Sequence, residues 1–392
     1  MSETAPETIY DVLIVGGGPA GSTLAWCLRD SNLRVAILDK KTFPRDKVCA
    51  GWVTPAVLEE IGLDKDDYQK ENILEPIFGF KVSQIGKSEI ETRYTDEPAS
   101  YSIRRCEFDH YLIKRSGAEM LLGEKFKEMT KIPQGWLVNG EHKARLVVGA
   151  GGHFCPVVRT MGAKLGNSET IVAAQEIEFE MTAEQAANCP VTADVPELFF
   201  CEDLLGYGWV VRKGNYLNVG LGREDNHKLS EHVAKFRLGL IEQGKIPAET
   251  PPKFHGHAYL LYPRATRPLL QDGVMIIGDA AGLAYPESGE GIRPAIESAL
   301  IAAQAIEQAN GDYSQSGLEN YRLGLTKRLG KRGGKEVMDY LPTWFKQSLA
   351  GVLLTTHWFV KNYVVERWFL HSHQAPLIFD SARDKAAAVS TD

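Results

Sequence analysis

Three glycines near the N-terminus have the spacing of a turn that binds a dinucleotide. Gly16, Gly18 and Gly21 follow the apolar run VLIV and form the pattern G-x-G-x-x-G. The first glycine permits a tight turn, the second lets the backbone approach a pyrophosphate, and the third allows close packing of a helix on a strand. Pro19 and Ala20 would open that helix, so its free N–H groups and positive dipole end would face the phosphates.

An acidic residue follows at the position where a ribose is expected. Asp39 ends a second apolar run, VAIL, and its carboxylate could accept hydrogen bonds from ribose hydroxyls; Lys40 comes next. Strand, glycine turn, helix, strand and acid therefore occur in the order that a dinucleotide site requires. The alternative is an ordinary βαβ unit without a ligand.

A second glycine-rich segment, GVMIIGDAAG at 273–282, predicts a buried strand that ends in a turn at Gly278 and Asp279. The Asp279 carboxylate could bond a ribityl hydroxyl of a flavin. A helix starting just beyond would aim N–H groups at the N1–C2=O edge of the ring, where its dipole stabilises negative charge. The backbone N–H groups in question belong to Gly289, Gly291 and Ile292. The alternative is a strand–turn–helix with no ligand.

Cys49 is a candidate catalytic residue. It follows Arg45 and Lys47, whose positive charges would favour the thiolate if they lie nearby. A thiol beside a flavin could donate a proton while hydride leaves the flavin. The alternative is a buried structural cysteine, because free cysteines are among the most buried residues.

Tyr207 and Trp209 are the other candidate active-site residues. They lie two positions apart in a predicted strand, so their rings point to the same face. Two such rings form a suitable wall for an apolar substrate, although core packing explains them equally well.

The surrounding sequence predicts the elements that position these residues. Residues 10–65 predict the first βαβ unit and a following loop and helix, and RLVVGAGG at 145–152 predicts another buried strand. Residues 107–121 and 290–309 have the apolar spacing of helices. Residues 78–103 and 170–222 alternate polar and apolar, which predicts a second, largely antiparallel sheet, and 229–244 follows as a helix.

The predicted fold class is α/β. A Rossmann-like FAD-binding domain would be interleaved with an antiparallel β substrate domain, followed by a C-terminal helical region. The FAD-binding domain would comprise 1–77, 104–168 and 262–312; the substrate sheet, 78–103 and 169–261; a helical cap, 313–380; and a flexible tail, 381–392.

Over roughly residues 10–310, the chain resembles the geranylgeranyl reductase family of FAD-dependent oxidoreductases. That family belongs to the flavoprotein class of the p-hydroxybenzoate-hydroxylase type. The motifs that carry the resemblance are VGGGPAG, FPRDKVC, RRCEFDHYL, VVGAGG, YGW and IIGDAAGLAYPESGEGI. The resemblance implies FAD as cofactor and reduction of carbon–carbon double bonds in an isoprenoid or lipid-like apolar substrate.

The resemblance also implies roles for single residues. The N-terminal glycines and Asp39 would hold the ADP part of FAD, Arg105 would contact FAD, and Gly278 and Asp279 match the family's G-D motif. The segment carrying Arg45, Cys49 and Ala50 would also line the cofactor.

Three departures from the family pattern limit the inferences that it supports. Cys49 is followed by Ala50, Gly51 and Trp52 instead of a glycine run. The family's central motif, G-A-D-G, becomes GAGG at 149–152, which lacks the carboxylate often associated with a nicotinamide cofactor. The electron donor could therefore be NADPH, visiting transiently, or a small reduced redox protein. The Y-x-W-x-F-P motif keeps only its aromatic pair, so a C20 prenyl substrate is not specifically implied.

Two alternatives remain open. The same scaffold could be a flavin-dependent monooxygenase of an aromatic or polyketide substrate. It could also be a non-catalytic flavin-binding redox partner at a membrane. A halogenase is disfavoured because the usual W-x-W-x-I-P motif is absent.

Composition and charge argue against several other classes of protein, among them nucleic-acid-binding and disulfide-rich proteins. With 44% hydrophobic and 24% charged residues, the protein has a typical globular composition, and its net charge of −7 gives no general attraction to nucleic acid. The six cysteines form no C-x-x-C pair, so we predict neither a metal site nor a disulfide scaffold. No leader or membrane-spanning stretch is evident, and we expect a cytoplasmic setting.

Residues 327–370 could contact a membrane surface. A basic face is followed by an aromatic-rich stretch, which suits peripheral binding at the inner face of the membrane. Packing of the aromatics on the domain is the favoured alternative. The residues are Lys327, Arg328, Lys331, Arg332 and Lys335, then Trp344, Phe345, Trp358, Phe359, Tyr363, Trp368 and Phe369. The sequence does not predict an oligomeric state.

Overall fold

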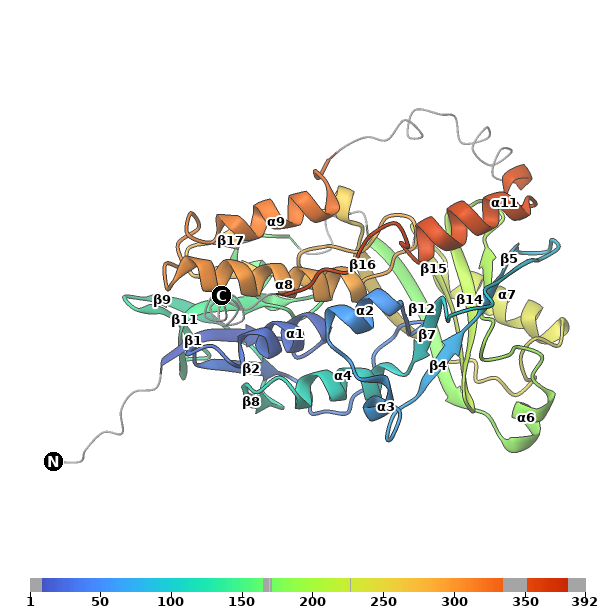
Figure 1. Ribbon diagram of the computed structural model, residues 1–392, viewed down its shortest axis with the longest axis horizontal. Helices are drawn as coiled ribbons and strands as arrows, with labels where there is room; N and C mark the ends of the chain where they lie inside the picture. Colours follow the sequence, from blue (N-terminus) through green and yellow to red (C-terminus); the bar gives the residue numbers. More distant parts are fainter. Residues whose placement is uncertain (1–8, 165–168, 170, 226, 334–350, 380–392) are drawn as a thin grey trace, which may run out of the picture.

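The computed structural model of the protein describes residues 9–164, 169, 171–225, 227–333 and 351–379. Two large sheets dominate it, one with helices packed on it at the left of Figure 1 and one strongly twisted at the right. A third, small sheet has three strands. The described residues thus have the predicted mixed α/β character.

The eight-stranded sheet has a parallel centre in the order β18-β11-β1-β2-β8. Its central strands are apolar on both faces, as strands covered on both sides must be. The parallel strands are β1 (Ile9–Val15), β2 (Val35–Asp39), β8 (Glu119–Leu122), β11 (His142–Gly149) and β18 (Val274–Ile276). Antiparallel strands at its margins are β9 (Met129–Ile132), β10 (Gly135–Val138) and β17 (Leu270–Gln271).

Helices cover this sheet. Helix α1 (Pro19–Leu28) packs against both α4 (Arg105–Lys114) and α8 (Ile292–Ala309). Helix α8 is rich in buried alanines, which lets it approach its neighbours closely. Helix α9 (Glu319–Leu329) packs on α8, and the short α5 (Pro156–Thr160) follows β11 (Figure 1).

The seven-stranded sheet has the order β16-β12-β15-β14-β13-β5-β6 and is antiparallel except for the β13–β5 pair. Helix α7 (Leu229–Glu242) packs on one face of it, and α6 (Ala183–Asn188) lies in a connection. Its strands are β5 (Gly79–Gln84), β6 (Ile90–Arg93), β12 (Ile171–Glu180), β13 (Glu197–Phe200), β14 (Gly206–Lys213), β15 (Tyr216–Arg223) and β16 (His255–Leu260).

The three-stranded sheet joins the two large ones. Strand β7 (Ser100–Ile103) pairs with β3 (Trp52–Val53) on one side and β4 (Leu74–Ile77) on the other, and it also contacts β14. Helices α2 (Pro55–Glu60) and α3 (Lys65–Tyr68) connect β3 to β4. The segment that follows Cys49 is therefore anchored where the two large sheets meet.

The C-terminal segment returns across the molecule. Helix α11 (His357–Phe359) and the π-helix η4 (Val360–Phe369) pack on the seven-stranded sheet, and residues 370–379 run on toward α2 and α8 (Figure 1). Phe369 is fully buried, whereas Trp358 is 62% exposed. The predicted positions Lys335, Trp344 and Phe345 and the tail 381–392 lie outside the described residues.

One predicted helix is wrong in its extent. The helix expected over 107–121 begins at Arg105 and ends at Lys114, and its last residues form strand β8 instead. Gly117 has a φ of +73°, which breaks the helix and lets the backbone turn into the sheet. The 3₁₀ turns η1 (Tyr262–Arg264) and η2 (Gly278–Ala280) flank β18.

Candidate functional site

The N-terminal glycine turn is tightly packed at its first and third glycines and open at its second. Gly16 has a φ of +117°, and a Cβ there would lie 2.5 Å from the Ala150 carbonyl oxygen. A Cβ on Gly21 would collide with the Gly16 carbonyl. At Gly18 the nearest atom to such a Cβ is Nη2 of Arg45, 3.6 Å away. The backbone at Gly18 thus leaves room for a ligand to approach.

The first turn of α1 is suited to bind an anion. Pro19 and Ala20 form its first turn, no side chain caps it, and the turn contains no acidic residue. Asp39, at the end of β2, accepts the Gly17 N–H at 2.8 Å and the Lys41 N–H at 2.9 Å. These bonds fix the carboxylate beside the glycine turn, as a ribose-binding acid requires. Lys40 is exposed at the end of the strand.

One buried carboxylate holds two arginines together. Arg105 donates from Nε and Nη2 to Asp109 at 2.8 and 2.9 Å, and Arg45 lies 3.3 Å from the same carboxylate. Asp109 is fully buried, so this bidentate pair has a rigid geometry. Arg105 also interacts with the Cys49 side chain. Both predicted arginines are therefore placed between the glycine turn and Cys49.

Asp279 is part of a row of three polar side chains. Its carboxylate lies 3.6 Å from Nε2 of His257, and Nζ of Lys47 lies 3.0 and 3.1 Å from the two ring nitrogens. Burial and the neighbouring Lys47 lower the pKa of His257. Burial and then Arg105 lower the pKa of Lys47 to about 8. A neutral imidazole can accept from Lys47 with one nitrogen and donate to Asp279 with the other.

Helix α8 begins against this row. A Cβ on Gly291 would lie 2.8 Å from Oδ1 of Asp279, and Ile292 is the first helical residue. Glu290 accepts the Arg293 N–H at 3.2 Å with one oxygen; its other oxygen is buried without a partner among the described residues. Burial raises the pKa of Glu290 to about 7. Gly278 and Gly289 have positive φ angles and lie in the turns directly before Asp279 and Glu290.

Cys49 and the two predicted aromatic residues meet where the sheets join. The Cys49 carbonyl accepts from Nδ2 of Asn218 at 3.1 Å, and Oδ1 of Asn218 accepts from Nε1 of Trp209 at 2.8 Å. The rings of Tyr207 and Trp209 lie 5.9 Å apart on one face of β14, as predicted. Tyr207 donates to the Ser288 carbonyl at 2.5 Å, which connects β14 to the loop before α8.

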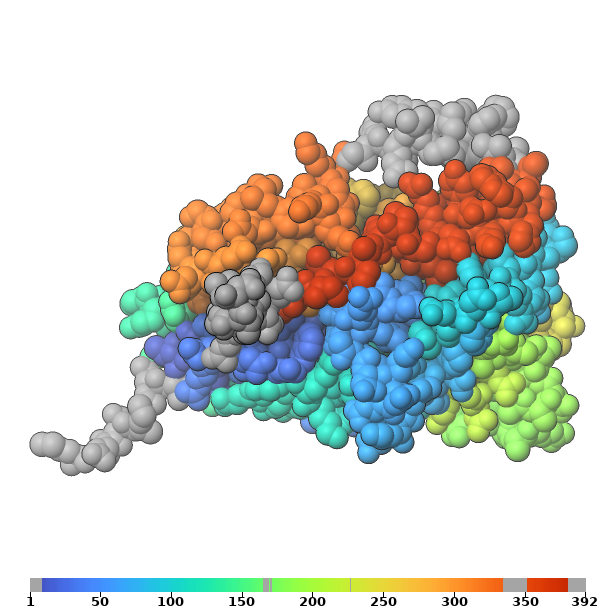
Figure 2. Space-filling view, viewed as in Figure 1, coloured from blue at the N-terminus to red at the C-terminus, as the bar shows by residue number. Residues whose placement is uncertain are grey.

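An apolar cluster continues from these rings. Phe369 of η4 lies 5.2 Å from Tyr207 and 5.9 Å from Trp52, between ring centroids, and Ala50 packs against the same cluster. In Figure 2 the C-terminal segment runs from the seven-stranded sheet, which it covers, to the surface beside α2 and α8. The face that carries Tyr207 and Trp209 is thus covered by the C-terminal helices.

Sequence patterns missed several residues of this site. Asp109 lies within the motif RRCEFDHYL but had no predicted role, and it holds Arg105. His257 and Asn218 stand in segments without a motif, and only the fold brings them to Asp279 and Cys49. Glu176 and Glu178 could have been found, because two carboxylates at alternate positions of one strand share a face that here is buried.

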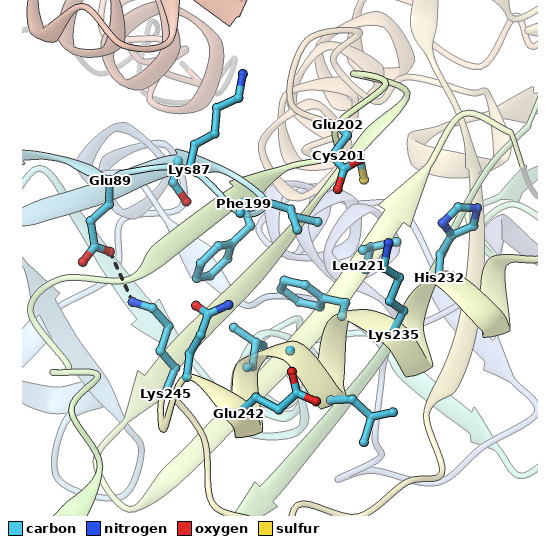
Figure 3. A pocket seen from close by; sticks show the side chains of 18 of the residues that line it. Lys87, Glu89, Phe199, Cys201, Glu202, Leu221, His232, Lys235, Glu242 and Lys245 are labelled. Carbon is cyan, nitrogen blue, oxygen red and sulfur yellow. Dashed lines mark hydrogen bonds and ion pairs between the residues drawn. The ribbon is translucent and has the colours of Figure 1, made fainter.

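The other face of the seven-stranded sheet has a cavity of about 950 Å³ beside α7. Phe199, Leu221 and Lys245 are among its lining residues, and Lys245 forms an ion pair with Glu89 (Figure 3). None of the predicted site residues lines it. Among the residues that the structure describes, no three side chains of metal-ligating types cluster together.

A match to a protein family identifies the kind of domain that contains the glycine turn and the residues around it. A family model described as an FAD binding domain matches residues 9–326. The chain belongs to the FAD binding domain family. The residues present fit this cofactor, because an uncapped helix start and an open second glycine suit a pyrophosphate, and two fixed carboxylates can accept hydrogen bonds from hydroxyl groups.

Two relatives match this FAD binding domain protein over most of its length. A digeranylgeranylglycerophospholipid reductase of Methanocaldococcus jannaschii is 27% identical over 389 residues, which cover 92% of this chain and 96% of the relative. An uncharacterised protein of Methanosarcina barkeri is 30% identical over 76% of this chain and 75% of its own length. The resemblance to the geranylgeranyl reductase family is therefore confirmed.

A solved structure supports the fold. A geranylgeranyl bacteriochlorophyll reductase-like protein from Thermoplasma acidophilum superimposes with a TM-score of 0.69 and 22% identity, over 97% of this chain and 96% of that one. The predicted α/β flavoprotein fold is confirmed, and so is the assignment to the FAD-dependent oxidoreductases. Within the described residues, every helix is too short or too polar to cross a membrane.

Proposed function

We propose that this flavoprotein reduces carbon–carbon double bonds of an isoprenoid or lipid-like apolar substrate. The observation that carries the proposal is the meeting of Cys49 with the aromatic face of Tyr207 and Trp209 beside the start of α8. The name of the Methanocaldococcus relative, a reductase of a polyprenyl phospholipid, supports the same substrate class.

Bound FAD would supply hydride chemistry, which no side chain can provide. In this proposal the ADP part is held by Gly16, Gly18, Gly21 and the first turn of α1, with Asp39 at the ribose. Asp279 holds the ribityl group, and Gly289, Gly291 and Ile292 face the ring. Arg45, Arg105, Lys40 and Ala50 complete the cofactor contacts.

The protein's own groups have two further tasks. The rings of Tyr207, Trp209 and Phe369 exclude water and align an apolar substrate, which lowers the entropic part of the barrier. Cys49 donates the proton that completes saturation, next to the cations of Lys47 and Arg105. We also propose that the domains divide as the sequence predicts, with the reaction taking place where they meet.

The test is an anaerobic incubation of FAD-loaded enzyme with excess dithionite and a phospholipid that carries polyprenyl groups. The proposal predicts products heavier by two hydrogen atoms for each reduced bond, identified by mass spectrometry. Unchanged lipid after full reduction of the flavin would contradict it. The same polyprenyl lipid with dithionite and free FAD, but without enzyme, controls for chemical reduction.

The same preparation in air distinguishes the monooxygenase alternative. A monooxygenase would yield products heavier by one oxygen atom when oxygen and an aromatic substrate are supplied. The reductase instead loses coupling in air, because oxygen consumes its electrons without entering the lipid. Oxygen-18 in an organic product would therefore replace the proposed reaction with hydroxylation.

For the electron donor, we propose either NADPH in transient contact or a small reduced redox protein. The GAGG turn at 149–152 has no carboxylate for a nicotinamide cofactor, which favours the redox protein. Rapid anaerobic flavin reduction by NADPH alone, at a rate matching turnover, would exclude that preference.

We propose that the protein works in the cytoplasm, with peripheral contact to the inner face of the membrane. Trp358 and Val352, with exposed fractions of 62% and 66%, and the partly exposed Tyr363 could enter the headgroup region, while Phe369 stays in the core. Co-sedimentation with anionic liposomes tests this. Loss of binding in Trp358→Ala is expected, and equal recovery in the supernatant with and without lipid would end the idea.

A further inference from the structure

Two buried side chains of the seven-stranded sheet lie against the backbone of Cys49, and one of them holds its carbonyl. Asn218 on β15 donates from Nδ2 to the Cys49 carbonyl at 3.1 Å. Glu176 on β12 lies close enough to the Cys49 backbone N–H for that group to favour its carboxylate form. Asn218 is completely buried and Glu176 is 4% exposed. The conformation of this peptide is thus set by the substrate sheet, although Cys49 itself follows the dinucleotide-binding elements.

Glu176 retains hydrogen-bonding capacity beyond this contact. Its Oε2 is buried and has no partner among the described residues. The charged groups that face it are Lys213 on β14 and Glu178 on its own strand, and these two pair with each other at 2.7 Å. Because the Lys213 charge is largely neutralised by Glu178, burial dominates and raises the pKa of Glu176 to about 7.

The sheet makes room for this carboxyl. Gly220 lies opposite both Glu176 and Trp209 in the strand register. A Cβ at Gly220 would collide with the indole of Trp209 and lie 2.9 Å from Cβ of Glu176. The glycine therefore allows the indole and the carboxyl to lie side by side beneath Cys49.

We propose that Asn218 and Glu176 are positioning residues for Cys49 and that Glu176 returns to Cys49 the proton given to the substrate. The proposal rests on the proposed function. In the reduction, the Cys49 S–H bond breaks as a C–H bond forms at the second carbon, and the hydride comes from reduced FAD. The Glu176 O–H bond then breaks and the S–H bond reforms. The carboxylate regains its proton from solvent.

The first test does not need turnover. Alkylation of Cys49 by iodoacetamide is followed in FAD-loaded enzyme on both sides of pH 7, and the Cys49 peptide is quantified by mass spectrometry. Ionisation of Glu176 above about pH 7 places a like charge beside the thiolate, so the wild-type rate should change slope there. The break should vanish in Glu176→Gln and persist in Glu180→Gln, an exposed carboxylate on the same strand. An unchanged break in Glu176→Gln overturns the proposal.

The second test uses the lipid reduction. Wild-type kcat should fall above about pH 7, because Glu176 must be protonated to return a proton. Glu176→Asp should keep that fall, whereas Glu176→Gln should lose it and turn over about tenfold more slowly with little change in KM. A merely structural role would slow both variants without altering the pH profile, and that result overturns the relay. If wild type reduces no lipid, the proposed function fails and the alkylation result still decides the positioning.

Discussion

At the scale of single residues, the cofactor site separates groups that build the turn from groups that meet the ligand. Gly21 supports the fold itself, because any side chain there would collide with the Gly16 carbonyl. Gly18 faces open space in the protein, so a side chain at this position would clash only with a bound pyrophosphate. This difference can be measured.

Gly18→Ala should leave the melting temperature of the cofactor-free protein nearly unchanged and weaken FAD binding by about tenfold or more. Gly21→Ala should lower both the melting temperature and the affinity for FAD, because its side chain clashes with the Gly16 carbonyl even without the ligand. Thermal unfolding and fluorescence titration with FAD provide the two readouts. Equal loss of stability in the two variants would show that Gly18 does not face the ligand.

Cys49→Ala should retain FAD and slow the reduction by more than about tenfold, because a proton donor next to the substrate is removed. Cys106→Ala, which changes another partly buried cysteine on α4, is the matched control. Single-turnover oxidation of reduced enzyme by lipid gives the rate. If the Cys49 variant reacts at the wild-type rate, water or another group supplies the proton.

We expect Lys47 to make FAD binding depend on pH, because its ammonium lies 3.0 Å from His257, which contacts the proposed ribityl-binding Asp279. Burial and then Arg105 lower its pKa to about 8, so its positive charge is present below that pH and lost above it. FAD affinity should therefore fall about three- to tenfold as pH rises through 8. In Lys47→Met this dependence should disappear, whereas the exposed Lys114→Met should behave like wild type. A pH-independent Kd in wild type would contradict the role.

At the scale of elements, sequence patterns located the parts that recur in any dinucleotide fold. The apolar run before Gly16 became β1, and the alanine-rich stretch became α8 starting at Ile292. The pairing of β7 with β3 and β4 was not predictable, because short strands carry no mark of which sheet they join. Cys49, Asp279 and Tyr207 were singled out by type and motif; Asn218 and His257 required the fold itself.

A buried ion-pair cluster connects the C-terminal segment to α8, and no sequence motif predicted it. Arg293 contacts Glu297 at 2.9 Å and Glu60 at 3.2 Å, and it donates to the carbonyls of Gln374 and Ala375. Arg293 lies in the first turn of the helix that starts at the proposed flavin site. The cap over the substrate sheet and the cofactor helix are therefore mechanically connected.

Arg293→Met should destabilise the protein by about 3 kcal/mol or more, because the buried Glu60 and Glu297 would keep only the partly exposed Arg328 as a charged partner. Arg322→Met on α9, whose ion pair with Glu319 is exposed to solvent, should leave the stability nearly unchanged. Urea unfolding measures both, and limited proteolysis should cut the Arg293 variant first near 371–379. Similar costs for both arginines would show that the cluster does not hold the segment.

At the scale of the whole molecule, the reacting groups come from parts of the sequence that are far apart. Cys49 follows the dinucleotide elements, Tyr207 and Trp209 belong to the antiparallel sheet, and Phe369 arrives from the C-terminal segment. The interleaving explains why no single segment of the protein could form the site alone. It also explains why removal of the C-terminal helices would expose the aromatic face to water.

The most direct test of the account is anaerobic stopped-flow mixing of reduced, FAD-loaded wild-type enzyme with a polyprenyl phospholipid. Flavin absorbance should recover in a lipid-dependent step, with one double bond reduced for each flavin oxidised. The same lipid with saturated hydrocarbon tails should leave the flavin reduced. A flavin that stays reduced with both lipids would contradict the proposed reduction of carbon–carbon double bonds.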